Sequence, residues 1–81
     1  MVQVYVLLSL LDGATYVGMT MNLARRLKEH NGGSNRYTKG HRPWKVIYTE
    51  SYVNWSEARI REKFLKTTAG KSYLKEIGIL I

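Results

Sequence analysis

The sequence predicts a small α+β fold, in which a three-stranded antiparallel sheet is flanked by two to three helices. Residues 2–11 are almost continuously apolar and rich in β-branched and aromatic side chains, a pattern typical of a strand that is covered on both faces. Two later segments, 22–30 and 56–69, instead carry apolar residues at helical spacing behind good capping residues. Helices and hairpin-linked strands in one short chain indicate this fold class.

The strands are expected in three places. Residues 2–11 form the central strand, Asp12-Gly13 supplies a tight turn, and residues 14–18 return as the second strand of a hairpin. Residues 44–51 are expected to form the third strand. Side chains alternate along a strand, so Tyr5 and Leu7 share one face, as do Tyr16 and Gly18. Whether the two tyrosine rings meet depends on the register of the hairpin.

The first helix is expected from the N-cap Asn22 to about His30, where the Asn31-Gly32-Gly33 run ends it. On this helix Arg26 and His30 are spaced i, i+4 beside the apolar stripe, whereas Arg25 and Glu29 face outward. Residues 32–43 are expected to form a flexible basic loop.

The next helix is expected to be capped by Ser56, to bury Ile60, Phe64 and Leu65, and to hold Glu62 at the boundary of its apolar face. Gly70 is expected to break the chain before a last short helix over residues 72–77. Arg61 falls inside the apolar arc of the helix, so it is expected to make an ion pair or a phosphate contact.

Composition limits the function. A chain of 81 residues has room for one domain, here residues 1–81, and the absence of cysteine excludes disulfides and thiolate metal sites and favours a cytoplasmic location. The longest apolar stretch is too short to span a bilayer, so no membrane is expected. The formal net charge of +7 makes nucleic acid the first partner to consider, ahead of an anionic membrane surface. The basic residues are clustered. One group lies in the expected loop and just after it, and it comprises Arg36, Lys39, Arg42 and Lys45.

Four positions carry a resemblance to a known family. Val4-Tyr5-Val6 and Tyr16-Val17-Gly18 lie about a hairpin apart, Arg26 follows in a helical segment, and Glu62 lies in a later one. This ordered set resembles the signature of the GIY-YIG nuclease superfamily, and the compact sequence looks like its small stand-alone bacterial members, similar to the catalytic domains of structure-selective flap and junction nucleases. The resemblance implies metal-assisted cleavage of a phosphodiester.

The resemblance also implies roles for individual residues. Tyr5 would be the general base or orient the attacking water beside Tyr16, and the backbone near Gly18 would approach the substrate. Arg26 would hold the scissile phosphate, and His30 would donate or shuttle a proton near it. Glu62 would carry the divalent ion, Mg²⁺ or Mn²⁺, which needs one carboxylate because substrate phosphate and water complete its shell. Further substrate contacts are expected from basic side chains, namely Arg36, Lys39, Arg42 and Arg61.

Each residue also has a structural explanation. Tyrosine is common in strands and cores, a histidine at a helix end can interact with the helix dipole, and Glu62 is spaced to pair with Lys66. The chain departs from the family pattern in having Gln3 in place of the glycine of the first motif and Met19 where some relatives have lysine. A terminal asparagine found in repair and homing members has no clear match.

Three functions follow. The first is a metal-dependent endonuclease that nicks DNA, selecting branched or flap-containing structure rather than sequence. A dimer or two encounters would be needed to cut both strands. The second is a non-catalytic nucleic-acid-binding module on the same fold, in which Tyr37 and Trp44 stack on unpaired bases. The third is a catalytic piece that works beside a protein partner. Retention of Tyr5, Tyr16, Arg26 and Glu62 together favours the first.

Overall fold

The sheet has three antiparallel strands in the order β2-β1-β3. The computed structural model describes residues 1–81, and its strands are β1 (Val2–Ser9), β2 (Thr15–Thr20) and β3 (Trp44–Tyr52). β1 is the central strand, as its continuous apolar sequence predicts, because it is the one strand with a neighbour on each side and helices over both faces. β2 forms one edge of the sheet.

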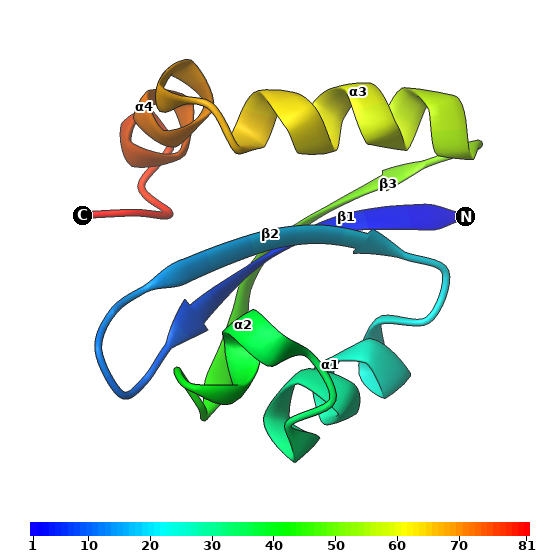
Figure 1. Cartoon of the computed structure of the whole chain (residues 1–81). Coiled ribbons are helices and arrows are strands. Elements are labelled where there is room, and N and C mark those ends of the chain that lie inside the picture. Colours follow the sequence, from blue (N-terminus) through cyan, green and yellow to red (C-terminus); the bar gives the residue numbers. More distant parts are fainter.

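Helices cover both faces of this sheet. Figure 1 shows α3 and α4 on one side and α1 and α2 on the other, with β2 between the two helical layers. The bounds are α1 (Leu23–Gly32), α2 (Arg36–Lys39), α3 (Trp55–Leu65) and α4 (Thr68–Glu76). The predicted α+β class is therefore confirmed, with one more helix than expected. No helix has the length and apolar character needed to cross a membrane.

The alternation of side chains along β1 divides the interior into two clusters. Val2, Val4 and Val6 point toward α3 and α4, where they pack with Ala58, Leu65 and Leu74. Tyr5 and Leu7 point to the opposite face and pack with Trp44 against α1. The candidate tyrosine therefore belongs to the smaller cluster, which is partly closed by Leu23 and Leu27 as their helical spacing predicts.

Side-chain caps define where the helices begin. Asn22 accepts a hydrogen bond from the backbone N–H of Arg25, so the predicted cap of α1 is correct. Asn35 caps α2 in the same way, which shows that the expected loop over residues 32–43 contains a helical turn. α3 is capped by Asn54, two residues before the predicted Ser56, because Asn54 has the extended backbone that frees its side chain to accept from Glu57 N–H.

The third and fourth helices differ from the sequence prediction in two further ways. Ile60 is 73% exposed rather than buried, because the face of α3 that meets the sheet runs through Ala58, Glu62 and Leu65. Gly70 lies buried inside α4 instead of breaking it, and Thr67 caps that helix. A Cβ atom at Gly70 would lie 2.1 Å from the carbonyl oxygen of Phe64, so glycine permits the close turn from α3 into α4.

Candidate functional site

The two tyrosines come together on one face of the β1–β2 hairpin. In the register of this hairpin Tyr5 is opposite Gly18 and Leu7 is opposite Tyr16, which places both rings on the same side. Their centroids are 6.4 Å apart. A Cβ atom at Gly18 would lie 2.5 Å from the Tyr5 hydroxyl oxygen and 3.1 Å from the Tyr16 ring. The missing side chain of Gly18 thus lets the Tyr5 ring lie across β2, the edge strand.

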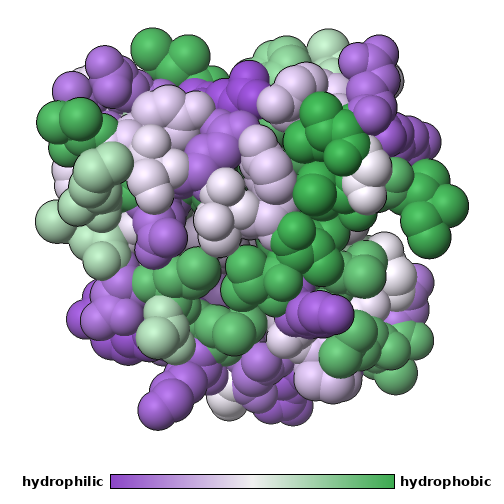
Figure 2. Space-filling model, turned by 180° about the vertical axis from the view of Figure 1, so that it is seen from behind, coloured by the Kyte–Doolittle hydropathy of each residue, from purple (hydrophilic) through white to green (hydrophobic).

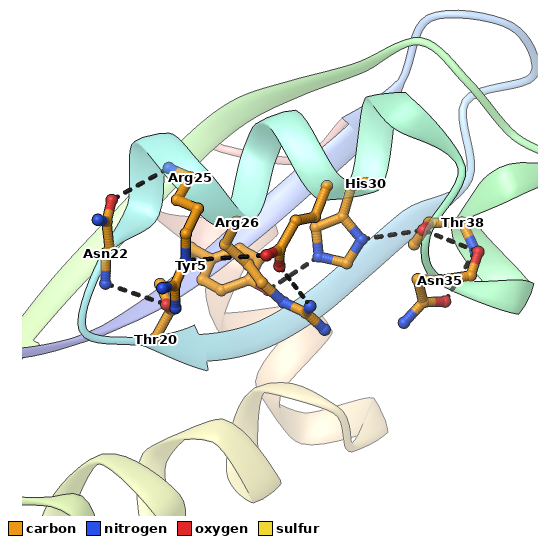
Figure 3. Close-up of polar contacts among 9 residues, drawn as sticks. Tyr5, Thr20, Asn22, Arg25, Arg26, His30, Asn35 and Thr38 are labelled. Atoms are coloured by element: carbon orange, nitrogen blue, oxygen red, sulfur yellow. Dashed lines mark hydrogen bonds and ion pairs between the residues drawn. The ribbon is translucent and has the colours of Figure 1, made fainter.

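A hydrogen-bonded chain runs from Tyr5 through His30 into α2 (Figure 3). The Tyr5 hydroxyl is 3.0 Å from Nε2 of His30, and Nδ1 of His30 is 2.9 Å from Oγ1 of Thr38. Thr38 donates its own proton to the carbonyl oxygen of Asn35, so Oγ1 is left to accept from Nδ1–H. This assigns the proton of the neutral imidazole to Nδ1 and makes Nε2 the acceptor for the Tyr5 hydroxyl.

Burial sets the protonation states of this chain. His30 is fully buried, and its burial, assisted by the positive charge of Arg26, lowers its pKa from the ordinary value of 6.5. Burial raises the pKa of Tyr5 above 10.0, although the nearby Arg26 guanidinium acts in the opposite direction. At neutral pH the pair is therefore a phenol that donates to a neutral imidazole. Such a pair can hand a proton from the phenol to the ring nitrogen once a reaction demands it.

Arg26 is brought to the same place by α1. Its guanidinium donates to Glu29 at 2.9 Å, and this hydrogen bond raises the pKa of Arg26, which stays charged. The side chain is one-third exposed, whereas that of Arg25 is 70% exposed and pairs with Glu29 at the longer distance of 3.7 Å. Arg25 is thus the more exposed of the two arginines, as their positions on the helix predict. Glu29 was expected to face outward, but its carboxylate accepts a hydrogen bond from Arg26.

Glu62 approaches from the opposite helical layer. It lies on the buried face of α3, its side chain is 10% exposed, and its negative charge contributes to the raised pKa of Tyr5. Lys66 and Arg59 lie near its carboxylate, at 3.5 and 3.7 Å. Tyr5 lies across the edge strand, so charges on α1 and on α3 both act on the pKa of its hydroxyl.

The donor set limits which metal fits. No group of three or more histidine and carboxylate side chains is arranged to hold an ion. Glu62 is the carboxylate whose charge reaches the Tyr5 hydroxyl. A single carboxylate suits Mg²⁺ or Mn²⁺, which accept phosphate oxygens and water as their remaining ligands. The partners of Glu62 are more than half exposed and pair weakly, so they can yield to an ion at little cost.

The other predicted substrate contacts fall into two groups. Arg36, Lys39 and Arg42 are exposed on and after α2, and Arg42 Nε donates to the carbonyl oxygen of Lys39 at 3.0 Å. Arg61 is not brought to the site. Its guanidinium makes two hydrogen bonds to Glu50, at 2.8 and 3.0 Å, and lies over the rings of Phe64 and Tyr73. The ion pair expected as one alternative for Arg61 is thus present.

Sequence reasoning missed Thr38 and the packing around Tyr37. Thr38 is fully buried and orients His30, and its one local signal is the capping Asn35 three residues earlier. Trp44, considered for base stacking, is 3% exposed and donates its indole N–H to the carbonyl oxygen of Thr38. Tyr37 lies on α2 with its ring 6.1 Å from that of Tyr16. These contacts join segments that are separate in the chain.

Known proteins share this combination of sequence and fold. Residues 1–75 match the family model described as the GIY-YIG catalytic domain. A UPF0213 protein of Clostridium perfringens is 42% identical over 68 residues, which are 83% of this chain and 73% of the relative. A UPF0213 protein of Staphylococcus epidermidis is 40% identical over 67 residues, which are 82% of this chain and 82% of the relative.

A solved structure agrees with these sequence matches. The solution NMR structure of a UPF0213 protein from Bacillus halodurans superposes with a TM-score of 0.57 at 30% sequence identity, covering 96% of this chain and 86% of that one. The matched region contains the hairpin, α1 and α3, from which the tyrosines, Arg26 and Glu62 come. The chain therefore belongs to the GIY-YIG family.

Proposed function

We propose that this protein is a metal-dependent endonuclease that hydrolyses DNA phosphodiester bonds. The observation that carries the proposal is the hydrogen-bonded pair of Tyr5 and His30, 3.0 Å apart, whose phenol also experiences the charges of Arg26 on α1 and Glu62 on the sheet-facing side of α3. Phosphodiester cleavage needs a proton acceptor for the attacking water, positive charge at the phosphate and a divalent ion. These side chains supply a candidate for each need.

Tyr5 and His30 would act together as the proton acceptor. Tyr5 would orient the attacking water. As the phenol passes its own proton to Nε2 of His30, the phenol oxygen would take a proton from the water. Thr38 holds the imidazole in the tautomer whose Nε2 can receive the phenol proton. A phenol with a raised pKa is a poor base by itself, so the contact with His30 is what makes this role chemically reasonable. Tyr16 packs against the His30 ring at 4.9 Å and supports its orientation.

Arg26 and Glu62 would bind the charged groups of the reaction. A phosphate can replace Glu29 as the partner of Arg26, because both side chains are about one-third exposed and a paired guanidinium fits two phosphate oxygens. Glu62 would hold Mg²⁺ or Mn²⁺. When bound, such an ion neutralises charge on the phosphoryl oxygens and lowers the pKa of its water. Gly18 is buried, and the Tyr5 hydroxyl and the Tyr16 ring fill the space above it, so it would act by positioning Tyr5 rather than by the direct approach to substrate that was expected of its backbone.

The surface around the site favours recognition of DNA shape over sequence. The helix α2 carries the basic residues Arg36 and Lys39 and is followed by Arg42. It has four residues and is too short to follow a groove and read base edges. Most affinity would then come from phosphates, and branched or flap-containing DNA is the proposed substrate. One site cuts one strand, so cutting both would require a dimer or two encounters. A cytoplasmic location remains a prediction from composition.

A cleavage assay with matched variants tests the proposal. Labelled flap, fork and duplex DNA would be incubated with the protein and Mg²⁺, Mn²⁺ or chelator. We expect metal-dependent nicking, lost by at least about 100-fold in Glu62→Gln because the metal-binding charge is gone. Glu57→Gln, an exposed change on the same helix, should retain activity. Arg26→Lys should lose activity and Arg25→Lys should keep it.

The same assay identifies the outcome that would overturn the proposal. Binding of DNA without nicking under all metal conditions would assign the protein to the alternative class, a non-catalytic nucleic-acid-binding module. Undiminished nicking by Glu62→Gln would remove Glu62 from the site. Activity that appears only after cell extract is added would indicate a required partner.

A further inference from the structure

A row of aromatic side chains extends away from the candidate site along the surface. The Tyr37 ring lies 6.1 Å from that of Tyr16, at an interplanar angle of 27°, and 4.8 Å from that of His41. Trp44 lies beneath the row, with its ring 6.0 to 6.5 Å from each of the other three. We define Tyr16, Tyr37 and His41 as the aromatic row, and Trp44 is buried beneath it.

The row is held in place from below, while Tyr37 remains open to solvent. The indole N–H of Trp44 donates to the carbonyl oxygen of Thr38 at 2.8 Å, and Nδ1 of His41 is 2.6 Å from the Asp12 carboxylate. Asn35 accepts from the backbone N–H of Tyr37 at 3.0 Å. Tyr37 is nevertheless 50% exposed. An aromatic ring that is ordered and half open can accept a stacking partner with little further loss of entropy.

Charge and position indicate the chemistry of that partner. Arg36 and Lys39 flank Tyr37 on α2, Arg42 packs back onto α2, and residues 30–45 include no acidic side chain. Exposed aromatic rings interleaved with basic residues are the usual surface for single-stranded nucleic acid, in which bases stack and phosphates pair. The Tyr16 ring is 4.9 Å from the His30 ring and 6.1 Å from that of Tyr37, so a base stacked on Tyr37 would be one aromatic ring removed from the Tyr5–His30 pair.

We infer that Tyr37 selects the substrate by stacking on an unpaired base beside the phosphate to be cut. The inference deepens the nuclease function proposed above and rests on it for the position of that phosphate. A base inside a duplex has both faces covered by its neighbours and cannot stack on the ring. An unpaired base at a flap or fork can, and this would make the junction the preferred place of cleavage.

Binding without metal tests the stacking separately from catalysis. A single strand of about 10 nucleotides would carry a fluorescent adenine analogue whose emission falls on stacking, and matched strands would have an abasic position or a full complement. In chelator we expect Tyr37→Ala to weaken single-strand binding by at least about five-fold and to abolish the quenching, because the stacking contact of one base is lost. Duplex affinity should stay unchanged.

Two variants serve as controls. Tyr37→Phe keeps the ring and should keep both the affinity and the quenching. Trp55→Ala removes an aromatic side chain that is also 50% exposed but lies on α3, in the other helical layer, and it should change neither. The thermal midpoint of each variant checks its folding. If Tyr37→Ala does not fold, the test uses the wild-type protein with the intact and the abasic strands. The wild-type protein should bind the abasic strand about five-fold less tightly than the intact one.

Several results would overturn the inference. The first is that the wild-type protein binds intact and abasic strands with equal affinity. The second is that Tyr37→Ala loses single-strand and duplex binding to the same extent. The third is that Trp55→Ala loses as much single-strand binding as Tyr37→Ala. Nicking of flaps by Tyr37→Ala with the wild-type ratio of flap to duplex cleavage would refute substrate selection and leave the nuclease function standing. Stacking without any cleavage would refute the nuclease function and keep Tyr37 as the contact to an unpaired base.

Discussion

Tyr5 joins the three kinds of side chain that phosphodiester cleavage uses. Its ring lies in the sheet core, 1% exposed, while its hydroxyl touches His30 and is within the electrostatic influence of Arg26 and Glu62. The buried ring gives the hydroxyl a defined position, and the polar neighbours determine its chemistry. At this scale the contacts of single atoms matter, so small substitutions should have large effects on activity.

Gly18→Ala tests the space above the edge strand. The new methyl group would lie 2.5 Å from the Tyr5 hydroxyl oxygen, so the ring must move and its hydrogen bond to His30 should break. We expect destabilisation of about 1–3 kcal/mol and a loss of nicking larger than the folding change explains. Chemical denaturation and the cleavage assay would measure both.

Gly32→Ala is the matched control for Gly18→Ala. A Cβ atom at Gly32 would have no neighbour within 4 Å, and this residue is the last of α1, so the substitution should leave activity intact. Full activity in Gly18→Ala would show that the Tyr5 hydroxyl does not need its present position.

The neutral state of His30 predicts a pH dependence of stability. Its pKa is lowered from 6.5 in the folded protein, so below that pH the unfolded chain binds a proton that the folded chain resists. The free energy of unfolding should therefore fall as pH drops through 6.5, and His30→Gln should flatten this decline. Urea denaturation from pH 8 to pH 5 would measure it.

His41→Gln is the comparison for this experiment, because the chain has two histidines and His41 is paired with Asp12 at the surface. The decline below pH 6.5 should persist in that variant. A decline that survives His30→Gln would mean that another group causes it.

At the scale of elements, two features shape the site. The edge position of β2 lets charged side chains of both α1 and α3 influence the Tyr5 hydroxyl that lies across it. The short helix α2 then supplies Thr38 to the interior and Tyr37 to the surface from adjacent positions. A helical turn directs neighbouring side chains about 100° apart, so one turn can serve both purposes.

Gly70→Ala tests the junction of α3 and α4. A Cβ atom there would lie 2.1 Å from the Phe64 carbonyl oxygen and 2.5 Å from the Leu65 Cα, both backbone atoms that cannot rotate away. We expect a loss of about 3 kcal/mol in the free energy of unfolding, at the upper end for overpacking. Gly40→Ala, which would meet no atom within 4 Å, should be nearly neutral. Equal stability of the two variants would contradict the close turn.

At the scale of the whole molecule, the positive charge is the feature that acts at a distance. The net charge is +7, and counterion release from DNA should make binding strongly dependent on salt. Figure 2 shows hydrophilic and hydrophobic residues side by side on the face of the molecule seen from behind. The basic residues of and after α2 lie nearest the aromatic row and should dominate the dependence.

A charge-matched pair of double variants tests this expectation. Arg36→Gln with Lys39→Gln removes two expected phosphate contacts and should reduce the slope of log affinity against log salt by about 1.5. Lys71→Gln with Lys75→Gln makes the same change of charge on α4, in the other layer, and should leave the slope nearly unchanged. Fluorescence anisotropy between 50 and 200 mM salt, the range over which such slopes are large, would measure both. Identical slopes would show that only net charge matters.

Features that depend on neighbours in the chain were predictable. The central strand follows from the apolar run of β1, the start of α1 from Asn22, and the family from the order of Tyr5, Tyr16, Arg26 and Glu62. The boundary errors are also local: Asn54 and Ser56 are both good caps, and the backbone chosen by the chain decided between them.

The sequence by itself determined the three strands, the helices α1 and α3, the charge and the identity of the candidate residues, because local propensity, periodicity and composition carry that information. Only the tertiary structure decided that Thr38 orients His30, that Arg61 pairs with Glu50, and that Glu62 faces the sheet. Each of these contacts joins segments whose separation in the chain says nothing about their distance in space. The register of β1 with β2 and the packing of helices on both faces bring them together, and packing is a property of the whole chain.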